Sequence, residues 1–474
     1  MSSLVRGSLL IAAGTIYKIL LSILIDKYLA VKLGVEDFGA YKYGITIVLL
    51  LSTLSSLGLG SSIVRFIAIQ NNSERKKMLI TTSLFLVGVT SVLILLLALS
   101  QVSFISIPTI FLYATIFFSF NTLFSSIYSG LEKPGLKVWI NDIFGFTAYV
   151  IFLWTFFNFS SHNEHIAIVY LLYAIFVFIV NLFFSKNFIT KINKKYISSS
   201  EFKEFILYST PLFGVSLLIM LSTHLDKLIL NFFVSERQLG IYYAVFNISN
   251  LIPLILIILV FMYLPRMSKT LQNGKLKKAT ILSSYFSKWT MIMASIFFGI
   301  IISYSDELLR LLYTQEFTEG AFVLKVLALG QWVNVSLGFT GQNLLALGDS
   351  KSQLYIRTFS FIIGSILLYV GSMYYGNFGA AISILIAMLF SNGLQIIILR
   401  IKHNFIGYRR QNFYALTLIL FSGLLLSYVH KLSIIQNMNF IFSIFIDIIV
   451  FILLLIFTKV IGKRDLKALK LTEY

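Results

Sequence analysis

The sequence contains no cysteine, and only 12% of its 474 residues are charged. The lack of cysteine excludes disulfide bonds and thiolate metal sites. Soluble domains carry about 25% charged residues, so the scarcity of charge excludes an ordinary soluble protein. Motifs of several enzyme classes are also missing: there is no GxxxxGK[ST] phosphate loop, no HExxH zinc site and no GxSxG nucleophile turn.

Long apolar runs take up most of the chain. Hydrophobic residues make up 58% of it, and the mean hydropathy is +0.89. Runs of about 20 apolar residues can cross a bilayer as helices, and these runs are too long and uniform for barrel strands. We therefore predict an all-α polytopic membrane protein with fourteen spans. The predicted spans lie near residues 8–31, 43–67, 79–100, 107–129, 139–158, 167–185, 205–232, 241–264, 281–304, 322–347, 354–376, 378–400, 413–430 and 438–459.

The orientation follows from the positions of the basic residues. Loops on the cytoplasmic side of a membrane carry an excess of Lys and Arg. With the N-terminus inside, most of the 38 basic residues fall in loops or tails on the cytoplasmic side, in regular alternation. We therefore expect both termini in the cytoplasm. The net charge of +19 is explained by this bias, so it does not indicate a nucleic-acid partner.

Two similar stretches lie about half the chain apart. Residues 24–44, the first motif, read LIDKYLAVKLGVEDFGAYKYG, and residues 225–244, the second motif, read LDKLILNFFVSERQLGIYYA. With one inserted residue, Asp26 aligns with Asp226, Lys27 with Lys227, Glu36 with Glu236, Gly39 with Gly240 and Tyr41 with Tyr242. Such an echo indicates an internal duplication.

The duplication predicts the domain organisation. We expect an N-terminal six-helix lobe at 1–200, a C-terminal six-helix lobe at 201–404, and two extra helices with a basic cytoplasmic tail at 405–474. Parallel repeats of this kind are related by an axis along the membrane normal, with the substrate path between the halves.

Several polar side chains fall inside the spans. A charge at mid-membrane costs about 2.5–3.5 kcal/mol on insertion scales and usually faces a cavity or a partner. One helical stripe of the first span holds Thr15, Lys18, Ser22 and Asp26, and the matching stripe of the seventh holds Ser216, Met220, His224, Lys227 and Asn231, with Asp226 off it. Lys18 lies deep in its span, which favours a functional role. For Lys27 and Asp226, an ion pair or a snorkelling lysine near the outer interface is an equal alternative.

Further candidate residues each have two open interpretations. Arg65 and Lys288 lie near the inner face, where they could anchor the helix or contact a substrate. His224 could be a hydrogen-bonded packing residue or an ion-coupling group. The amides Asn247, Gln331 and Asn334 could join helices or line a polar cavity. The sequence predicts no catalytic residue, no metal site and no cofactor.

Four stretches resemble one protein family. LGVEDFGAYKYG at 33–44 resembles the signature after the first helix of the polysaccharide-export family, in the multidrug/oligosaccharidyl-lipid/polysaccharide exporter superfamily. Residues 308–348 resemble its pattern around the ninth and tenth helices. SGLEKPG at 129–135 and LGDSKSQ at 347–353 correspond to its paired turns after the fourth and tenth helices.

The resemblance implies a MATE-like fold of two pseudo-symmetric bundles and a flippase of the Wzx type. Such a protein moves an undecaprenyl-diphosphate-linked oligosaccharide to the outer leaflet for O-antigen or capsule assembly. The implied setting is the cytoplasmic (inner) membrane of a prokaryote. The implied partners are the lipid bilayer, an H⁺ or Na⁺ counter-ion and other polysaccharide-assembly membrane proteins.

Physical chemistry is consistent with that task. A sugar hydroxyl costs several kcal/mol to desolvate in hydrocarbon, and a diphosphate requires cations along its path. The expected substrate-binding cations are Lys18, Lys227, Arg65 and Lys288. The expected ion-coupling or cavity-lining residues are Asp26, His224, Asp226, Asn247, Gln331 and Asn334.

Three different functions stay open on the sequence alone. A drug/cation antiporter of the same fold would need carboxylates facing its cavity, whereas the candidates here are mostly cationic. A lipid II flippase also carries adjacent basic and acidic residues in the first helix, although here the acidic residue comes first. An integral-membrane sugar transferase or polymerase is disfavoured by the short outside loops, so we expect no enzyme.

Overall fold

The computed structural model describes residues 2–101, 108–159, 166–191, 194–197, 199–408, 412, 440–458 and 460. Within these ranges all regular structure is helical, and no β-strand occurs. The all-α prediction is therefore confirmed. The chain divides into two compact units, Met1–Gly240 and Ile241–Tyr474. The lobe boundary expected near residue 200 stays a prediction.

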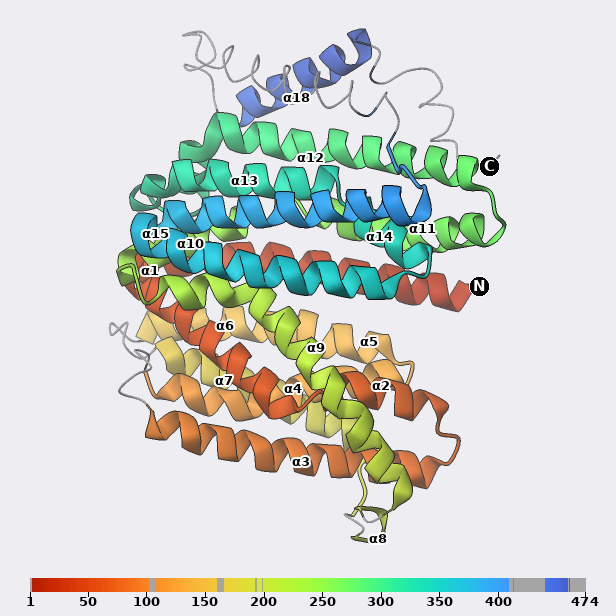
Figure 1. Cartoon of the computed structure of the whole chain (residues 1–474). Helices are drawn as coiled ribbons and strands as arrows, with labels where there is room; N and C mark the ends of the chain where they lie inside the picture. The colour runs from red at the N-terminus through yellow and green to blue at the C-terminus, as the bar shows by residue number, and fades with distance from the viewer. Residues whose placement is uncertain are drawn as a thin grey trace. The chain divides into compact units, whose positions relative to one another are not determined.

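The first unit is built around α4. Its helices are α1 (Ser2–Ser56), α2 (Leu59–Ile69), α3 (Ser73–Ser100), α4 (Ile110–Gly130), α5 (Pro134–Lys137), the π-helix η2 (Val138–Phe144), α6 (Gly145–Phe159), α7 (Ile166–Ser185), the 3₁₀ turn η4 (Lys186–Phe188), α8 (Lys194–Ile197) and α9 (Ser200–Leu230). In Figure 1, α3, α4 and α7 run side by side, and α4 packs against α1, α2, α3 and α7. The fully buried rings of Phe111, Phe124 and Tyr128 fill these contacts.

The second unit is built around α13. α10 (Glu236–Ser249) begins just before it, followed by α11 (Leu254–Gln272), α12 (Leu276–Leu312), the 3₁₀ helix η5 (Gln315–Gly320), α13 (Ala321–Ser336), α14 (Phe339–Ala346), α15 (Ser350–His403) and α18 (Phe440–Phe457). α13 packs between α12 and α15, and these three run nearly parallel in Figure 1.

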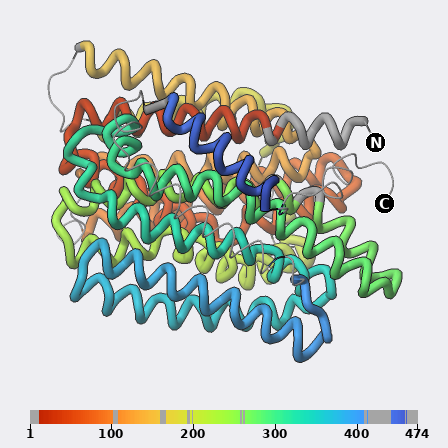
Figure 2. The backbone as a smooth tube through the Cα atoms, turned by 90° about the horizontal axis from the view of Figure 1, so that it is seen from above, coloured from red at the N-terminus to blue at the C-terminus, as the bar shows by residue number. Residues whose placement is uncertain are grey.

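Two of these helices fold back on themselves at a glycine. The backbone of α1 leaves helical geometry at Gly34, with φ 78°, and that of α15 at Gly376, with φ 54°. Only glycine adopts such angles without a steric penalty. In Figure 2 the two halves of α15, in shades of blue, lie side by side, and Ser383 Oγ of one half donates to Leu367 O of the other over 2.7 Å.

The fold-back changes one boundary. The second span was expected to begin near residue 43, but the helix resumes directly after Gly34. Lys42 therefore belongs to the second half of α1. Its position between the predicted spans 8–31 and 43–67 had suggested an outside loop instead. The apolar pattern implied a loop of about ten residues between the two spans. In the structure the chain reverses at a single glycine, Gly34.

Two predicted spans of the second unit each take in parts of two helices, although Gln315–Ala346 as a whole is long and apolar enough to be one span. The span expected near 241–264 is divided between α10 and α11, and the span expected near 322–347 between α13 and α14. In the described part of the chain, nine helices are long and apolar enough to cross a membrane, or ten when the pair Ala13–Ser56 and Leu59–Ile69, bent by 48°, counts as one span. α18 falls on the last predicted span. The thirteenth, 413–430, lies outside the described residues, so the count of fourteen stays a prediction.

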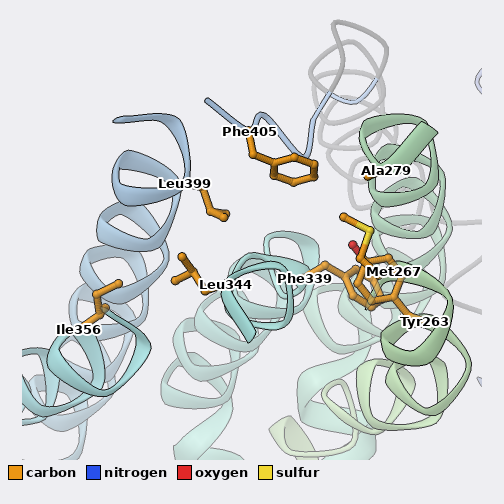
Figure 3. Close-up of a cluster of buried hydrophobic side chains, with 8 residues drawn as sticks. All are labelled: Tyr263, Met267, Ala279, Phe339, Leu344, Ile356, Leu399 and Phe405. Carbon is orange, nitrogen blue, oxygen red and sulfur yellow. The ribbon is translucent and has the colours of Figure 1, made fainter. Parts of the chain in front are cut away.

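Aromatic and aliphatic side chains join the helix ends of the second unit. Figure 3 shows this cluster, in which the ring of Phe339 on α14 lies 4.2 Å from that of Tyr263 on α11. Its members are Tyr263, Met267, Ala279, Phe339, Leu344, Ile356, Leu399 and Phe405. Each is at most 2% exposed. The cluster thus holds four helices together beside the start and end of α15.

The turn motif at 347–353 closes the same end. Asp349 caps α15 by accepting from Ser352 N over 3.2 Å, and its carboxylate lies 2.8 Å from Lys402 Nζ and 2.7 Å from His403 Nε2. Burial disfavours the charged carboxylate, but these hydrogen bonds hold the pKa of Asp349 well below its usual range. The first and last turns of α15 are therefore tied to one residue.

Candidate functional site

The acidic residue of the first motif pairs across the fold-back of α1. Lys42 Nζ lies 2.5 Å from Asp26 Oδ1, and the two side chains are 17% and 8% exposed. Lys42 also lies 5.5 Å from the centre of the Phe38 ring. Breaking one partner of a buried pair leaves an uncompensated charge, so this contact fixes the two halves of α1 against each other. Lys42 was not among the expected site residues, because its place in the helix depends on the turn at Gly34.

The neighbouring lysine of the first motif, Lys27, forms no ion pair in the described structure. Lys27 is partly buried, and among the described residues no carboxylate lies within 4.0 Å of its ammonium group. Asp26 is held by Lys42. The three charged residues Asp26, Lys27 and Lys42 therefore retain one positive charge that no ion pair in the described structure neutralises.

The second motif is arranged differently. Lys227 Nζ lies 2.9 Å from Asp226 Oδ2, with side chains 2% and 7% exposed. It also donates to Thr223 O over 3.1 Å, one turn earlier on α9. The ammonium group is thus turned back on its own helix. This arrangement corresponds to the ion pair that the sequence allowed for Asp226.

The motifs differ at the position of the lysine that pairs with Asp26. The position of Lys42 in the alignment is occupied by Tyr243 in the second motif. Tyrosine carries no positive charge, and the carboxylate of Asp226 lies 2.9 Å from the ammonium group of its neighbour Lys227. The two aspartates align in the sequence but have different partners.

The aligned glycines meet in space. A Cβ added to Gly39 would lie 2.3 Å from Glu236 O, and one added to Gly240 would lie 2.2 Å from Val35 O. Distances under 3 Å leave no room for a side chain. Each glycine therefore touches the carbonyl oxygen that lies four residues before the other, and the contact is reciprocal. The sequence showed these glycines as a repeat but not as neighbours.

Lys18 lies against a carboxylate that the sequence analysis did not single out. Its ammonium group is 3.5 Å from Asp142 Oδ1 and 5.1 Å from the centre of the Phe146 ring. The Lys18 side chain is 47% exposed, whereas that of Asp142 is 15% exposed. Asp142 lies in the π-helix η2, against which α1 packs. An acidic residue inside the fifth apolar run was the available signal.

The remaining cationic and histidine candidates fall into separate places. The guanidinium of Arg65 on α2 stacks 4.5 Å above the ring of Tyr208 on α9 and is exposed. Nδ1 of His224 is buried with no hydrogen-bond partner in the described structure. Lys288 on α12, in the second unit, is partly buried. The first unit thus holds Lys18, Arg65 and His224, and Lys288 is described with the second.

The amide candidates take part in helix contacts of the second unit. Gln331 Nε2 donates to Asn250 Oδ1 over 3.1 Å, and Asn392 Nδ2 donates to Asn334 Oδ1 over 3.2 Å. Asn247 is partly buried on α10. The bonds of Gln331 and Asn334 correspond to a helix-joining role.

A similar amide cluster in the first unit was missed. Asn181 on α7 is fully buried and donates to Asn121 Oδ1 and to Asn141 Oδ1, each over 3.3 Å. The cluster joins α4, η2 and α7. Its members lie far apart in the sequence, so no local pattern could bring them together.

The fold and the charged residues inside it define a class of protein. Membrane-length apolar helices with buried ion pairs inside the spans are typical of transporters. A family model described as "Polysaccharide biosynthesis protein" matches residues 4–271, more than half of the chain. The chain therefore belongs to the polysaccharide biosynthesis protein family.

Solved structures show the same fold. The chain is similar to the lipid II flippase MurJ in an inward closed conformation, with a TM-score of 0.75 and 16% identity over 97% of this chain and 99% of that chain. An inward-facing MATE family transporter of the MOP superfamily gives a TM-score of 0.67 and 15% identity over 82% and 94%. A MOP superfamily transporter from Pyrococcus furiosus, described by the reverse polarity of its binding pocket, gives 0.56 and 16% over 84% and 95%. No curated protein sequence matches the chain. The expected MATE-like fold is confirmed.

Proposed function

We propose that the chain flips an undecaprenyl-diphosphate-linked oligosaccharide from the cytoplasmic to the outer leaflet for O-antigen or capsule assembly. The family and the flippase fold support a lipid-linked substrate. The sugar head group would cross in a cationic cavity by alternating access, while the prenyl tail stays in the lipid. We place the protein in the cytoplasmic (inner) membrane of a prokaryote with both termini in the cytoplasm, working beside other polysaccharide-assembly membrane proteins.

The observation that carries this proposal is the exposure of Lys18. An ammonium group inside an apolar span is costly, and 47% of this side chain is open although a carboxylate lies 3.5 Å away. A purely structural ion pair would be enclosed, as the pair of Lys227 with Asp226 is. A diphosphate gains about 1.5–3 kcal/mol from each charge-assisted contact. Lys18 is therefore our first candidate for its cation.

Lys27 is the second cation of the proposal and replaces Lys227 in that role. Lys27 has no carboxylate partner among the described residues, whereas Lys227 is enclosed and paired. We assign Lys227 to positioning α9 rather than to direct substrate contact in this conformation. Arg65 and Lys288 stay candidates for contacts nearer the inner face.

A lipid II flippase is the second candidate function. The structural similarity to MurJ extends over nearly the whole of both chains. Lipid II and a polysaccharide repeat unit would present the same kind of head, a diphosphate that bears sugars. The cationic residues fit either substrate, and the family description favours the polysaccharide.

A drug/cation antiporter and a sugar transferase fit the site less well than a flippase does. The antiporter would need open carboxylates, but Asp26, Asp226 and Asp142 each have a lysine within 3.5 Å. A sugar transferase or polymerase would need catalytic groups in a loop outside the membrane. We also propose an H⁺ or Na⁺ counter-ion for the flippase, with Asp26, Asp226 and His224 as candidate coupling residues.

The test is complementation of two flippase-null strains, one blocked in surface polysaccharide and one in lipid II transport. We expect the chain to restore polysaccharide export in the first strain. Lys18→Gln should lower export about tenfold or more at equal membrane abundance, and Lys18→Arg should retain more. Lys77→Gln, which removes a lysine paired with Glu74 at the start of α3, is the matched control. Rescue of the lipid II strain alone would replace the first substrate by the second.

A further inference from the structure

Asp142 is held in place by the local geometry of the first unit. It lies on η2 (Val138–Phe144), a π-helix between α5 and α6. π-Helical segments are rare and often occur at functional sites. A Cβ on Gly14 of α1 would lie 2.2 Å from Val138 Cγ1, and Tyr17 OH is 2.8 Å from Thr147 Oγ1. Contacts on both sides of Asp142 thus fix η2 against the first half of α1.

Asp142 has a single polar partner. Within the described residues, Lys18 is the only side chain at hydrogen-bonding or ion-pairing distance from its carboxylate. The carboxylate side chain is only 15% exposed, whereas the lysine side chain is 47% exposed. Lys18 can therefore exchange partners without a movement of α1, whereas Asp142 cannot.

From this asymmetry we infer that Asp142 is an internal competitor for the substrate anion. It occupies Lys18 when no diphosphate is present, and an arriving diphosphate must take the ammonium group from it. This inference rests on the proposed function, because it gives the diphosphate site a built-in means of release. Asp142 is a positioning residue, since it acts on the substrate through Lys18.

Electrostatics sets the direction of the effect. When the diphosphate holds Lys18, the enclosed carboxylate of Asp142 loses its partner and repels the anion, which destabilises the bound state. On release, Lys18 returns to Asp142 and the ion pair is restored. Asp142 therefore both weakens the binding of the diphosphate and speeds its release. A transporter needs both, because a site that binds too tightly does not turn over.

The separation of the pair agrees with this role. The distance of 3.5 Å between Lys18 and Asp142 is longer than the 2.5 Å and 2.9 Å of the pairs in the two motifs. Ionised hydrogen bonds are commonly about 2.7–2.9 Å. The pair is thus close enough to occupy Lys18 and loose enough to be displaced.

The first experiment measures binding of inorganic diphosphate to the purified full-length chain in lipid nanodiscs. Asp142→Asn should bind about tenfold more tightly than the wild type, and Asp142→Glu should stay near the wild type. In a Lys18→Gln background, Asp142→Asn should change nothing. Glu74→Gln, which opens an exposed lysine pair at 3.3 Å, should also leave binding unchanged.

The second experiment measures flipping of undecaprenyl diphosphate bearing a fluorescent sugar in proteoliposomes. If Asp142 competes with the substrate, Asp142→Asn should lower both the half-saturating substrate concentration and the maximal rate of flipping. If Asp142 only oriented Lys18, the same variant would raise the half-saturating concentration. Unchanged or weaker diphosphate binding by Asp142→Asn, or no binding by either protein, overturns the competitor role. If that binding tightens but the wild type flips no isoprenoid diphosphate, the proposed function fails and the competitor role stands.

Discussion

The two motifs align in sequence but hold their charges in different ways. In the first, Asp26 is paired with Lys42 across the fold-back of α1, and Lys27 has no carboxylate partner in the described structure. In the second, Asp226 is paired with Lys227 on the same helix, and both are enclosed. Among the aligned positions that differ, the position of Lys42 is occupied by Tyr243, which carries no positive charge.

The difference teaches that a repeated sequence does not imply a repeated role. An aspartate inside a membrane takes whichever cation is near, because an unpaired charge is costly there. In the first motif a second lysine, Lys42, pairs with the aspartate, so the adjacent Lys27 is available to bind a substrate anion. In the second motif the adjacent lysine, Lys227, itself forms the ion pair with the aspartate. We propose on this basis that the two cations that hold the diphosphate, Lys18 and Lys27, lie in the first half of the chain.

The largest effect is expected at the contact that the two motifs share. Gly39→Leu or Gly240→Leu would place a side chain where a Cβ already meets a backbone carbonyl at 2.3 Å or 2.2 Å. Backbone atoms cannot yield as a flexible side chain does, so we expect little folded protein in the membrane. Gly214→Leu is the control, because nothing lies within 4 Å of a Cβ there. Equal abundance of all three variants would show that the contact is not required.

The next effect separates the aligned lysines. Lys227→Met removes the lysine that is paired with the enclosed Asp226, which we expect to lower the free energy of unfolding by about 3–5 kcal/mol. Lys27→Met removes a lysine that has no carboxylate partner, so it should lower export and leave stability nearly unchanged. Thermal unfolding in detergent and polysaccharide export, measured on both variants, make the comparison. A matching loss of stability in Lys27→Met would contradict the assignment of different roles.

Much of this comparison could be predicted from the sequence, and part of it could not. The apolar runs and the motif predicted the helical fold and the family, because each depends on patterns along one segment. The partner of Asp26 depended on the tight reversal at Gly34, which a loop of ordinary length would have excluded. Asp142 and Gly240 lie far in the chain from Lys18 and Gly39, and only the packing of helices brings them together.

A smaller effect tests where the motifs lie in the membrane. The chain has no cysteine, so single cysteines can be labelled without background. We predict that Lys32→Cys and Ser235→Cys, both at exposed positions of the motifs, react with an impermeant maleimide added outside intact cells. Lys203→Cys, exposed at the start of α9, should react only after the cells are opened. Labelling of all three from one side would break the predicted topology.

The most direct test of the central claim is a double-mutant cycle between Lys42 and Lys27, read as the rate of polysaccharide export. Lys42→Tyr gives the first motif the residue of the second, so Asp26 should turn to Lys27 and export should fall about tenfold. Lys27→Gln should produce a similar fall. If Lys42 acts by leaving Lys27 available, the double variant should export no more slowly than Lys27→Gln alone, because coupled residues are not additive. If, at equal membrane abundance, the fold-loss of export in the double variant is the product of the losses in the two single variants, the claim that Lys42 makes Lys27 available is contradicted.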